Sequence, residues 1–122
     1  MSTITVTNIK ATGETASRSA ASVAAAWVHG DMTGTAAIQD SFNFSSLTDN
    51  GTGNMSVTFT DNMANANWIF TTCFNNNAAD QGANLKSNSG TLSTSVLSVT
   101  KYENNNATDC TLFGCAVHGD LA

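Results

Sequence analysis

The stretch "TAAIQDSFNFSSLTDNGTGNMSVTFT", residues 35–60, decides the fold class. Its two flanks, residues 35–47 and 54–60, are rich in aromatic and β-branched residues, which favour extended strands. Between them, Asn50 and Gly51 form the dipeptide that most strongly predicts a hairpin, because both residues accept positive φ. The segment also resembles a calcium loop, but the late glutamate of such a loop is missing. We therefore predict two antiparallel strands joined by a turn at residues 48–53.

Three further segments of the chain predict strands. Residues 66–74, "ANWIFTTCF", form a nearly continuous apolar run, which predicts a strand buried on both faces. Residues 91–103 alternate between apolar and polar types, and residues 109–120 form a last strand. Because short turns separate these segments, we predict a mainly β protein, an antiparallel β-sandwich of about six to eight strands.

The N-terminal part predicts a different structure. Residues 3–9 alternate as an extended segment, and small apolar residues from Ala16 to Trp27 then recur at helical spacing. We expect a short helix over residues 13–22, and two regions: residues 1–23 for oligomerisation or docking, and residues 24–122 as the β-sandwich. Small residues let helices approach closely, so we expect a homotrimer; a monomer whose helix caps the sandwich is the alternative. The expected trimer or docking residues are Ile4, Val6, Ile9, Ala16, Ala20 and Val23.

Composition excludes several classes of partner. Charged residues make up 11% of the 122 residues and the net charge is −5. Four scattered cations cannot form the basic face that nucleic acid needs, and no apolar stretch is long enough for a membrane helix. The N-terminus lacks the pattern of a signal peptide, so we expect synthesis in a cytoplasm, with all three cysteines as thiols.

The tetrapeptide Val-His-Gly-Asp occurs twice, ending at Asp31 and at Asp120. Its side chains, His29, Asp31, His118 and Asp120, are candidate ligands for a divalent metal ion. The alternative is that both copies are simply strand ends. His and Asp also belong to hydrolytic triads, but no Gly-x-Ser-x-Gly motif is present. We therefore expect no catalytic residues, no enzyme activity and no cofactor, and we interpret the repeats as strand ends.

Asparagine-rich segments are candidates for surface recognition, because their amides can hydrogen-bond sugar hydroxyls. The alternative is that these asparagines only form turns. Trp68 and Tyr102 could stack on a sugar, although an apolar strand favours a core position for Trp68. The candidate receptor-binding residues are Asn75, Asn76, Asn77, Asn84, Asn88, Asn104, Asn105 and Asn106.

Several of these motifs together resemble a domain of tail-fibre-like structural proteins of phages, especially phages of aquatic bacteria. The similarity covers nearly the whole chain and is weakest in the asparagine-rich loops. The segments that carry it are residues 26–28 (Ala-Trp-Val), 40–46 (Asp-Ser-Phe-Asn-Phe-Ser-Ser), 48–53 (Thr-Asp-Asn-Gly-Thr-Gly), 57–60 (Val-Thr-Phe-Thr), 62–68 (Asn-Met-Ala-Asn-Ala-Asn-Trp) and 115–120 (Cys-Ala-Val-His-Gly-Asp).

The resemblance implies a virion protein of tail-fibre type that contributes to host attachment. Its expected partners are other virion proteins and a host surface glycan or protein. A capsid decoration protein of the same fold is the alternative, and a free carbohydrate-binding module is a weaker one. The sequence departs from the family at His29-Gly30-Asp31, where the family has Asn-Phe-Asn, and in having little chain before the domain. We therefore expect it to sit directly on another virion protein.

Overall fold

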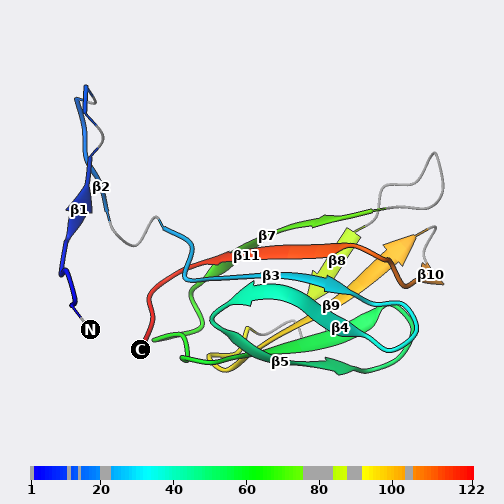
Figure 1. Ribbon diagram of the computed structural model, residues 1–122. Helices are drawn as coiled ribbons and strands as arrows, with labels where there is room; N and C mark the ends of the chain where they lie inside the picture. Colours follow the sequence, from blue (N-terminus) through cyan, green and yellow to red (C-terminus); the bar gives the residue numbers. More distant parts are fainter. Residues whose placement is uncertain are drawn as a thin grey trace.

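The structure is a computed structural model that describes residues 2–10, 12–13, 15–19, 23–75, 84–87, 92–103 and 106–122. The described residues form strands and no helix (Figure 1). The strands are β1 (Asn8–Ile9), β2 (Arg18–Ser19), β3 (Ala26–Asp31), β4 (Ala37–Phe42), β5 (Phe44–Asp49), β6 (Asn54–Phe59), β7 (Ile69–Phe74), β8 (Asn84–Ser87), β9 (Val96–Glu103), β10 (Asn106–Ala107) and β11 (Phe113–His118).

Two antiparallel sheets form a β-sandwich, as the sequence predicted. The four-stranded sheet has the order β4-β3-β11-β7. The five-stranded sheet has the order β10-β9-β6-β5, with β8 also pairing with β9. Strands β3 and β11, which begin and end the sandwich in sequence, lie side by side in the middle of the first sheet. The outer edges of that sheet are β4 and β7.

The predicted hairpin at residues 48–53 is confirmed as the connection between β5 and β6. The turn type differs from the two-residue turn that Asn-Gly favours. The N–H of Asn50 donates to Asn54 O at 2.9 Å and the N–H of Asn54 donates to Gly51 O at 2.8 Å. Positive φ falls on Gly51 (109°) and Gly53 (66°), not on Asn50. Two glycines therefore supply the left-handed backbone of a longer loop.

The predicted single strand over residues 35–47 is in fact two strands, one in each sheet. Asn43 separates β4 from β5 with φ of 59°, a conformation that asparagine tolerates better than most residues. Its side-chain amide donates to Ala25 O at 3.2 Å and to Asp61 O at 3.1 Å. The side-chain oxygen Oδ1 of Asn43 accepts from the N–H of Asp61 at 2.7 Å. These contacts hold the corner at which the chain crosses between the sheets.

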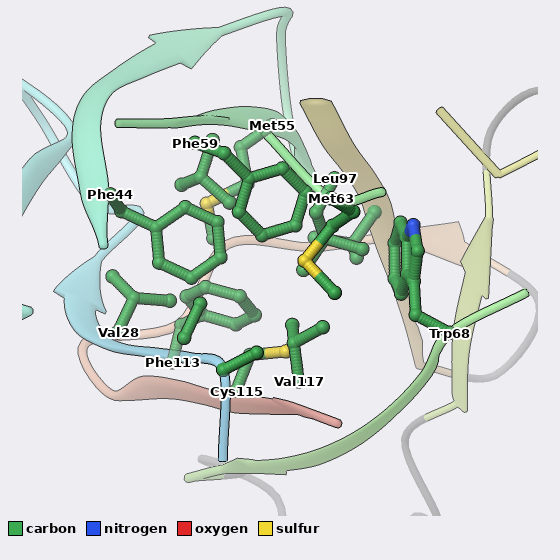
Figure 2. Packing of buried hydrophobic residues seen from close by; sticks show 14 of the residues in the cluster. Val28, Phe44, Met55, Phe59, Met63, Trp68, Leu97, Phe113, Cys115 and Val117 are labelled. Carbon is green, nitrogen blue, oxygen red and sulfur yellow. The ribbon is translucent and has the colours of Figure 1, made fainter. Parts of the chain in front are cut away.

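Inward-facing side chains of both sheets make one hydrophobic core (Figure 2). The Phe44 and Phe59 rings stack with centroids 4.8 Å apart, and Trp68 meets Phe59 edge-on at 5.7 Å. Trp68 is 2% exposed and its indole N–H donates to Ser93 O at 3.1 Å. The core position expected for Trp68 is therefore confirmed, with the polar ring nitrogen satisfied.

Strand β7 corrects the expectation of a strand buried on both faces. It lies at an edge of the four-stranded sheet and alternates between exposed and half-buried side chains, with Ile69 68% exposed. The apolar side chains of this run point in two directions. Trp68, Phe70 and Phe74 pack in or against the core, while Ile69 points outward. An apolar run alone cannot separate a central strand from an edge strand whose outer side is also apolar.

The expected N-terminal helix is wrong for the residues that the structure describes. Residues 12–13 form a turn in which Gly13 has φ of 90°, and β1 pairs antiparallel with β2 through Asn8–Ser19 and Ile9–Arg18. The helical stripe consisted mainly of alanines, whose burial contributes little, so the pattern did not fix a helix. The described part of the chain contains no helix of the length and apolar character needed to cross a membrane.

Candidate functional site

The outer face of the four-stranded sheet carries large apolar side chains. In β3 the buried residues Ala26 and Val28 alternate with Trp27 and His29, which point outward. Exposed fractions are 39% for Trp27, 52% for Phe42 and 68% for Ile69. We call this surface the apolar face and define it by these outward residues of β4, β3, β11 and β7: Asp40, Phe42, Trp27, His29, Gly114, Ala116, His118, Ile69, Thr71 and Cys73.

Strand register arranges the apolar face in rows. Trp27 lies opposite Phe42 on one side and opposite Ala116 on the other, and Ala116 lies opposite Thr71. The next row contains Asp40, His29, Gly114 and Cys73 in the same order across the sheet. Each row therefore has its smallest residue on β11, between larger residues on both neighbouring strands.

The small residues of β11 leave an open hollow of about 500 Å³ in the apolar face. Its lining includes His29, Thr71, Cys73, Leu112 and Ala116, and apolar atoms dominate the lining. A Cβ added to Gly114 would lie 2.5 Å from the Cys73 sulfur, so the thiol lies directly over the glycine. The absence of a side chain at Gly114 thus makes room for Cys73.

The row Asp40–His29–Gly114–Cys73 contains the residue types of a cysteine-nucleophile site, but not its geometry. His29 and Cys73 stand on strands separated by β11, about 10 Å apart at the main chain for two strand spacings. The Asp40 carboxylate accepts from the N–H of Ser41 at 2.9 Å. Among the described residues no hydrogen bond joins Asp40, His29 and Cys73, whereas a nucleophile needs its base within hydrogen-bond reach.

The four metal-ligand candidates are not brought together. His29 is level with Gly114, four residues along β11 from His118, or about 13 Å at the rise of a strand. Because β3 and β11 are antiparallel, Asp31 and Asp120 lie toward opposite ends of the sheet. Within the part of the chain that the structure describes, no group of three or more His, Cys, Asp or Glu side chains could hold a metal ion.

The first Val-His-Gly-Asp copy ends β3 and the second runs past the end of β11, as the strand-end interpretation predicted. Asp31 completes a local turn: its Oδ1 accepts from Thr33 Oγ1 at 2.6 Å and from the N–H of Thr33 at 2.7 Å. The hydrogen bond from the Thr33 hydroxyl, followed by that from its N–H, lowers the pKa of Asp31 below 3.8. Gly119 packs closely against Trp68, with no room for a Cβ.

Three of the receptor-binding candidates, Asn75, Asn84 and Asn106, lie among the described residues. Asn75 has a structural role, because its amide donates to Thr111 Oγ1 at 2.6 Å and its oxygen accepts from the N–H of Leu112 at 2.9 Å. Asn84 lies in β8 opposite Tyr102, and exposed Asn106 lies in β10 opposite Glu103. Asn76, Asn77, Asn88, Asn104 and Asn105 lie outside the described residues.

Sequence reasoning missed a buried lysine at the far end of the sandwich. Lys101 is 2% exposed, and its Nζ donates to Thr108 Oγ1 at 2.9 Å and to Asp109 O at 3.5 Å. The N–H of Gly53 donates to Asp109 Oδ1 at 2.5 Å, so this cluster fixes the β5–β6 turn. The inward alternation of Leu97 and Val99 continues to Lys101, and that signal in the sequence could have revealed its burial.

The three thiols are free, as expected, but they differ in environment. Cys73 is exposed, whereas Cys110 and Cys115 are buried. Burial raises the pKa of Cys110, whose thiol donates to the Met32 sulfur at 3.3 Å. Burial, and then the neighbouring Cys73, raises the pKa of Cys115 to about 12. Only Cys73 among the three is therefore accessible in the native chain.

The N-terminal docking candidates are exposed. Ile4, Val6, Ile9 and Val23 have exposed fractions of 86, 49, 43 and 55%, and Ala16 is also exposed. Ala20 lies outside the described residues. Hairpin β1–β2 stands apart from both sheets (Figure 1).

Comparison of the chain with family models, with curated proteins and with solved structures finds no match.

Proposed function

We propose that the chain is a non-enzymatic structural subunit of a phage virion, of tail-fibre type, which assembles with other copies and contributes to host attachment. The apolar face carries this proposal. A monomer in water exposes few large apolar patches, whereas Trp27, Phe42 and Ile69 are all exposed on one face of the same sheet, and that face also holds a hollow lined mainly by apolar atoms. Such a surface is typical of a protein that is completed by a partner.

The opposite outer face supports a role toward solvent. On the five-stranded sheet, five hydroxyl side chains point outward: Thr48, Ser56 and Ser98 form one row, and Ser46 and Thr58 stand beside Val96 in the next. Ser56 and Ser98 share a hydrogen bond of 2.8 Å, and the Asn50 amide donates to Ser56 at 2.9 Å. We call these five residues the hydroxyl face. Its donors and acceptors suit water or a sugar surface, and we assign host contact to this side of the subunit.

The helix whose small residues favoured a homotrimer is not present among the described residues. Assembly in this proposal therefore rests on the apolar face. That face is compatible with a homotrimer but does not fix the number of copies. Light scattering of the purified chain measures that number, because a monomer has a mass of 12.6 kDa.

Quantitative mass spectrometry of purified virions tests the function. A tail-fibre subunit is expected in tens of copies per particle, lost together with the tail after mechanical shearing. Hundreds of copies that remain on tail-less capsids would overturn the tail-fibre assignment in favour of a capsid decoration protein. Absence of the chain from particles that carry its gene would overturn both.

A further inference from the structure

The N-terminal arm, residues 2–23, displays apolar side chains that no other described part of the chain covers. Ile4 is 86% exposed, Val6 49% and Ile9 43%. Strands β1 and β2 pair with each other and with no strand of either sheet. The chain thus presents two uncovered apolar surfaces, the arm and the apolar face, which stand apart from each other (Figure 1). Each would be stabilised by covering the other, because contact removes apolar area from water.

At its base, the arm continues the line of β3 past the end of the sheet, so it leads away from the apolar face of its own chain. The N–H of Ala25 donates to Val117 O at 2.8 Å, and Ala25 is 7% exposed. The chain is therefore fixed in the line of β3 from Ala25 onward, and the arm leaves beyond the end of the sheet. To reach its own apolar face, the arm would have to reverse direction before Ala25, whereas the face of a neighbouring copy needs no reversal.

Charge favours the same pairing. Residues 2–23 contain Lys10 and Arg18 against Glu14, a net charge of +1. Residues 24–122 contain Lys86 and Lys101 against eight acids, a net charge of −6, and Lys101 is buried. The arm is therefore the one positively charged region of an acidic chain. Two sandwiches repel each other, while an arm and a sandwich attract each other at low ionic strength.

We propose that the N-terminal arm of one copy covers the apolar face of a second copy, with Ile4, Val6 and Ile9 packed over the hollow. His29 on β3 and Thr71 on β7 line opposite sides of that hollow, while Ala116 and Gly114 leave space for a side chain between them. This inference rests on the proposed function as an assembling subunit and names the segment that makes the contact.

A directed disulfide between two copies tests this contact. One copy carries Val6→Cys with Cys73→Ser and a mass tag; the other is the unmodified chain, whose exposed Cys73 lies in the apolar face. The two are mixed as whole chains and oxidised with glutathione disulfide. In the matched control, the second copy carries Thr58→Cys and Cys73→Ser, which moves the thiol to the hydroxyl face. We expect a tagged heterodimer through Val6→Cys and Cys73, in at least tenfold higher yield than in the control.

Each other outcome overturns the inference in a distinguishable way. A chain with Val6→Cys and native Cys73 that closes an internal disulfide as a monomer would show that the arm covers its own face. Equal yields from Cys73 and Thr58→Cys would show random collision. No heterodimer, in a sample that light scattering shows to be assembled, would overturn arm docking and leave the proposed function standing. A monomer in every sample would overturn self-assembly as well.

Discussion

The two outer faces of this sandwich are built on the same strand geometry and have opposite chemistry. Across the middle of the five-stranded sheet the outward row is Thr48, Ser56 and Ser98. Across the middle of the four-stranded sheet it is Phe42, Trp27, Ala116 and Thr71. Both sheets contribute to one core, so fold stability does not require this difference. Exposed aromatic side chains cost solubility, and a protein retains them where another surface covers them.

The largest expected effect comes from making the apolar face polar. Phe42→Ser combined with Ile69→Ser removes two side chains that are 52% and 68% exposed, so the fold should lose little stability. Full burial of such a side chain contributes about 1.5–3 kcal/mol, and only the part still exposed is left for a partner to cover, so association should weaken by roughly twentyfold to a few hundredfold. Sedimentation velocity over a concentration series measures this. The control is Ser56→Ala with Ser98→Ala on the hydroxyl face, and an equal loss of association in that variant would remove the distinction between the faces.

The next largest effect is expected on stability, at Gly53 in the β5–β6 turn. A Cβ at Gly53 would lie 2.5 Å from Thr108 N and 2.8 Å from Lys101 O, at φ of 66°. Gly34 has a similar φ of 62° with nothing within 4 Å, and is therefore the matched control. Gly34→Ala should cost about 1–2 kcal/mol for left-handed backbone alone, and Gly53→Ala roughly twice as much or more. Chemical denaturation measures both, and equal costs would show that the packing around Gly53 relaxes freely.

A smaller effect is expected at the hollow. Gly114→Ala places a methyl group against the Cys73 sulfur, the mobile end of a side chain, so the cost should be about 1 kcal/mol. Adding Cys73→Ala should recover most of that loss, because it removes the sulfur that the new methyl group at position 114 would contact. Thermal unfolding of the two single variants and the double variant gives the coupling. Additive losses would show that Cys73 does not lie over Gly114.

The smallest effect is a pH dependence at the end of β3. The pKa of Asp31 is lowered in the folded chain by the Thr33 hydroxyl, so the carboxylate stabilises the fold above its unfolded pKa near 3.8. That contribution is lost as the pH falls through the lower folded pKa. The difference in melting temperature between the native chain and Asp31→Asn should therefore shrink between pH 5 and about pH 2. A constant difference over this range would contradict the assignment.

Turn residues and alternating patterns in the sequence were enough to predict several strands and one hairpin. The hairpin of β5 and β6, strand β9 and the last strand were predicted from turn residues and alternation, and each is present. The helix failed because a stripe of alanines gives little packing energy, and Gly13 instead takes φ of 90° in a turn. The edge position of β7 could not be predicted, because an apolar run does not show which strands will flank it.

The candidate site was less predictable than the fold, since it depends on pairing between distant segments. Strand β11 lies between β3 and β7, so His29, Gly114 and Cys73 share one outward row. Nothing local to Ala116 or Trp27 signals that they are neighbours. The N-terminal apolar residues were recognised as docking candidates because their alternation is local. The surface that we propose for their docking, the apolar face, could be defined only from the structure.

The most direct test of an assembly role for the apolar face is the alkylation rate of Cys73 as a function of protein concentration. Cys110 and Cys115 are 2% and 5% exposed, so the native chain reports from one thiol. If the apolar face is the interface, the rate at Cys73 should fall at least tenfold between dilute monomer and assembled protein. An unchanged rate while light scattering shows a rising mass would place the interface elsewhere and contradict this account.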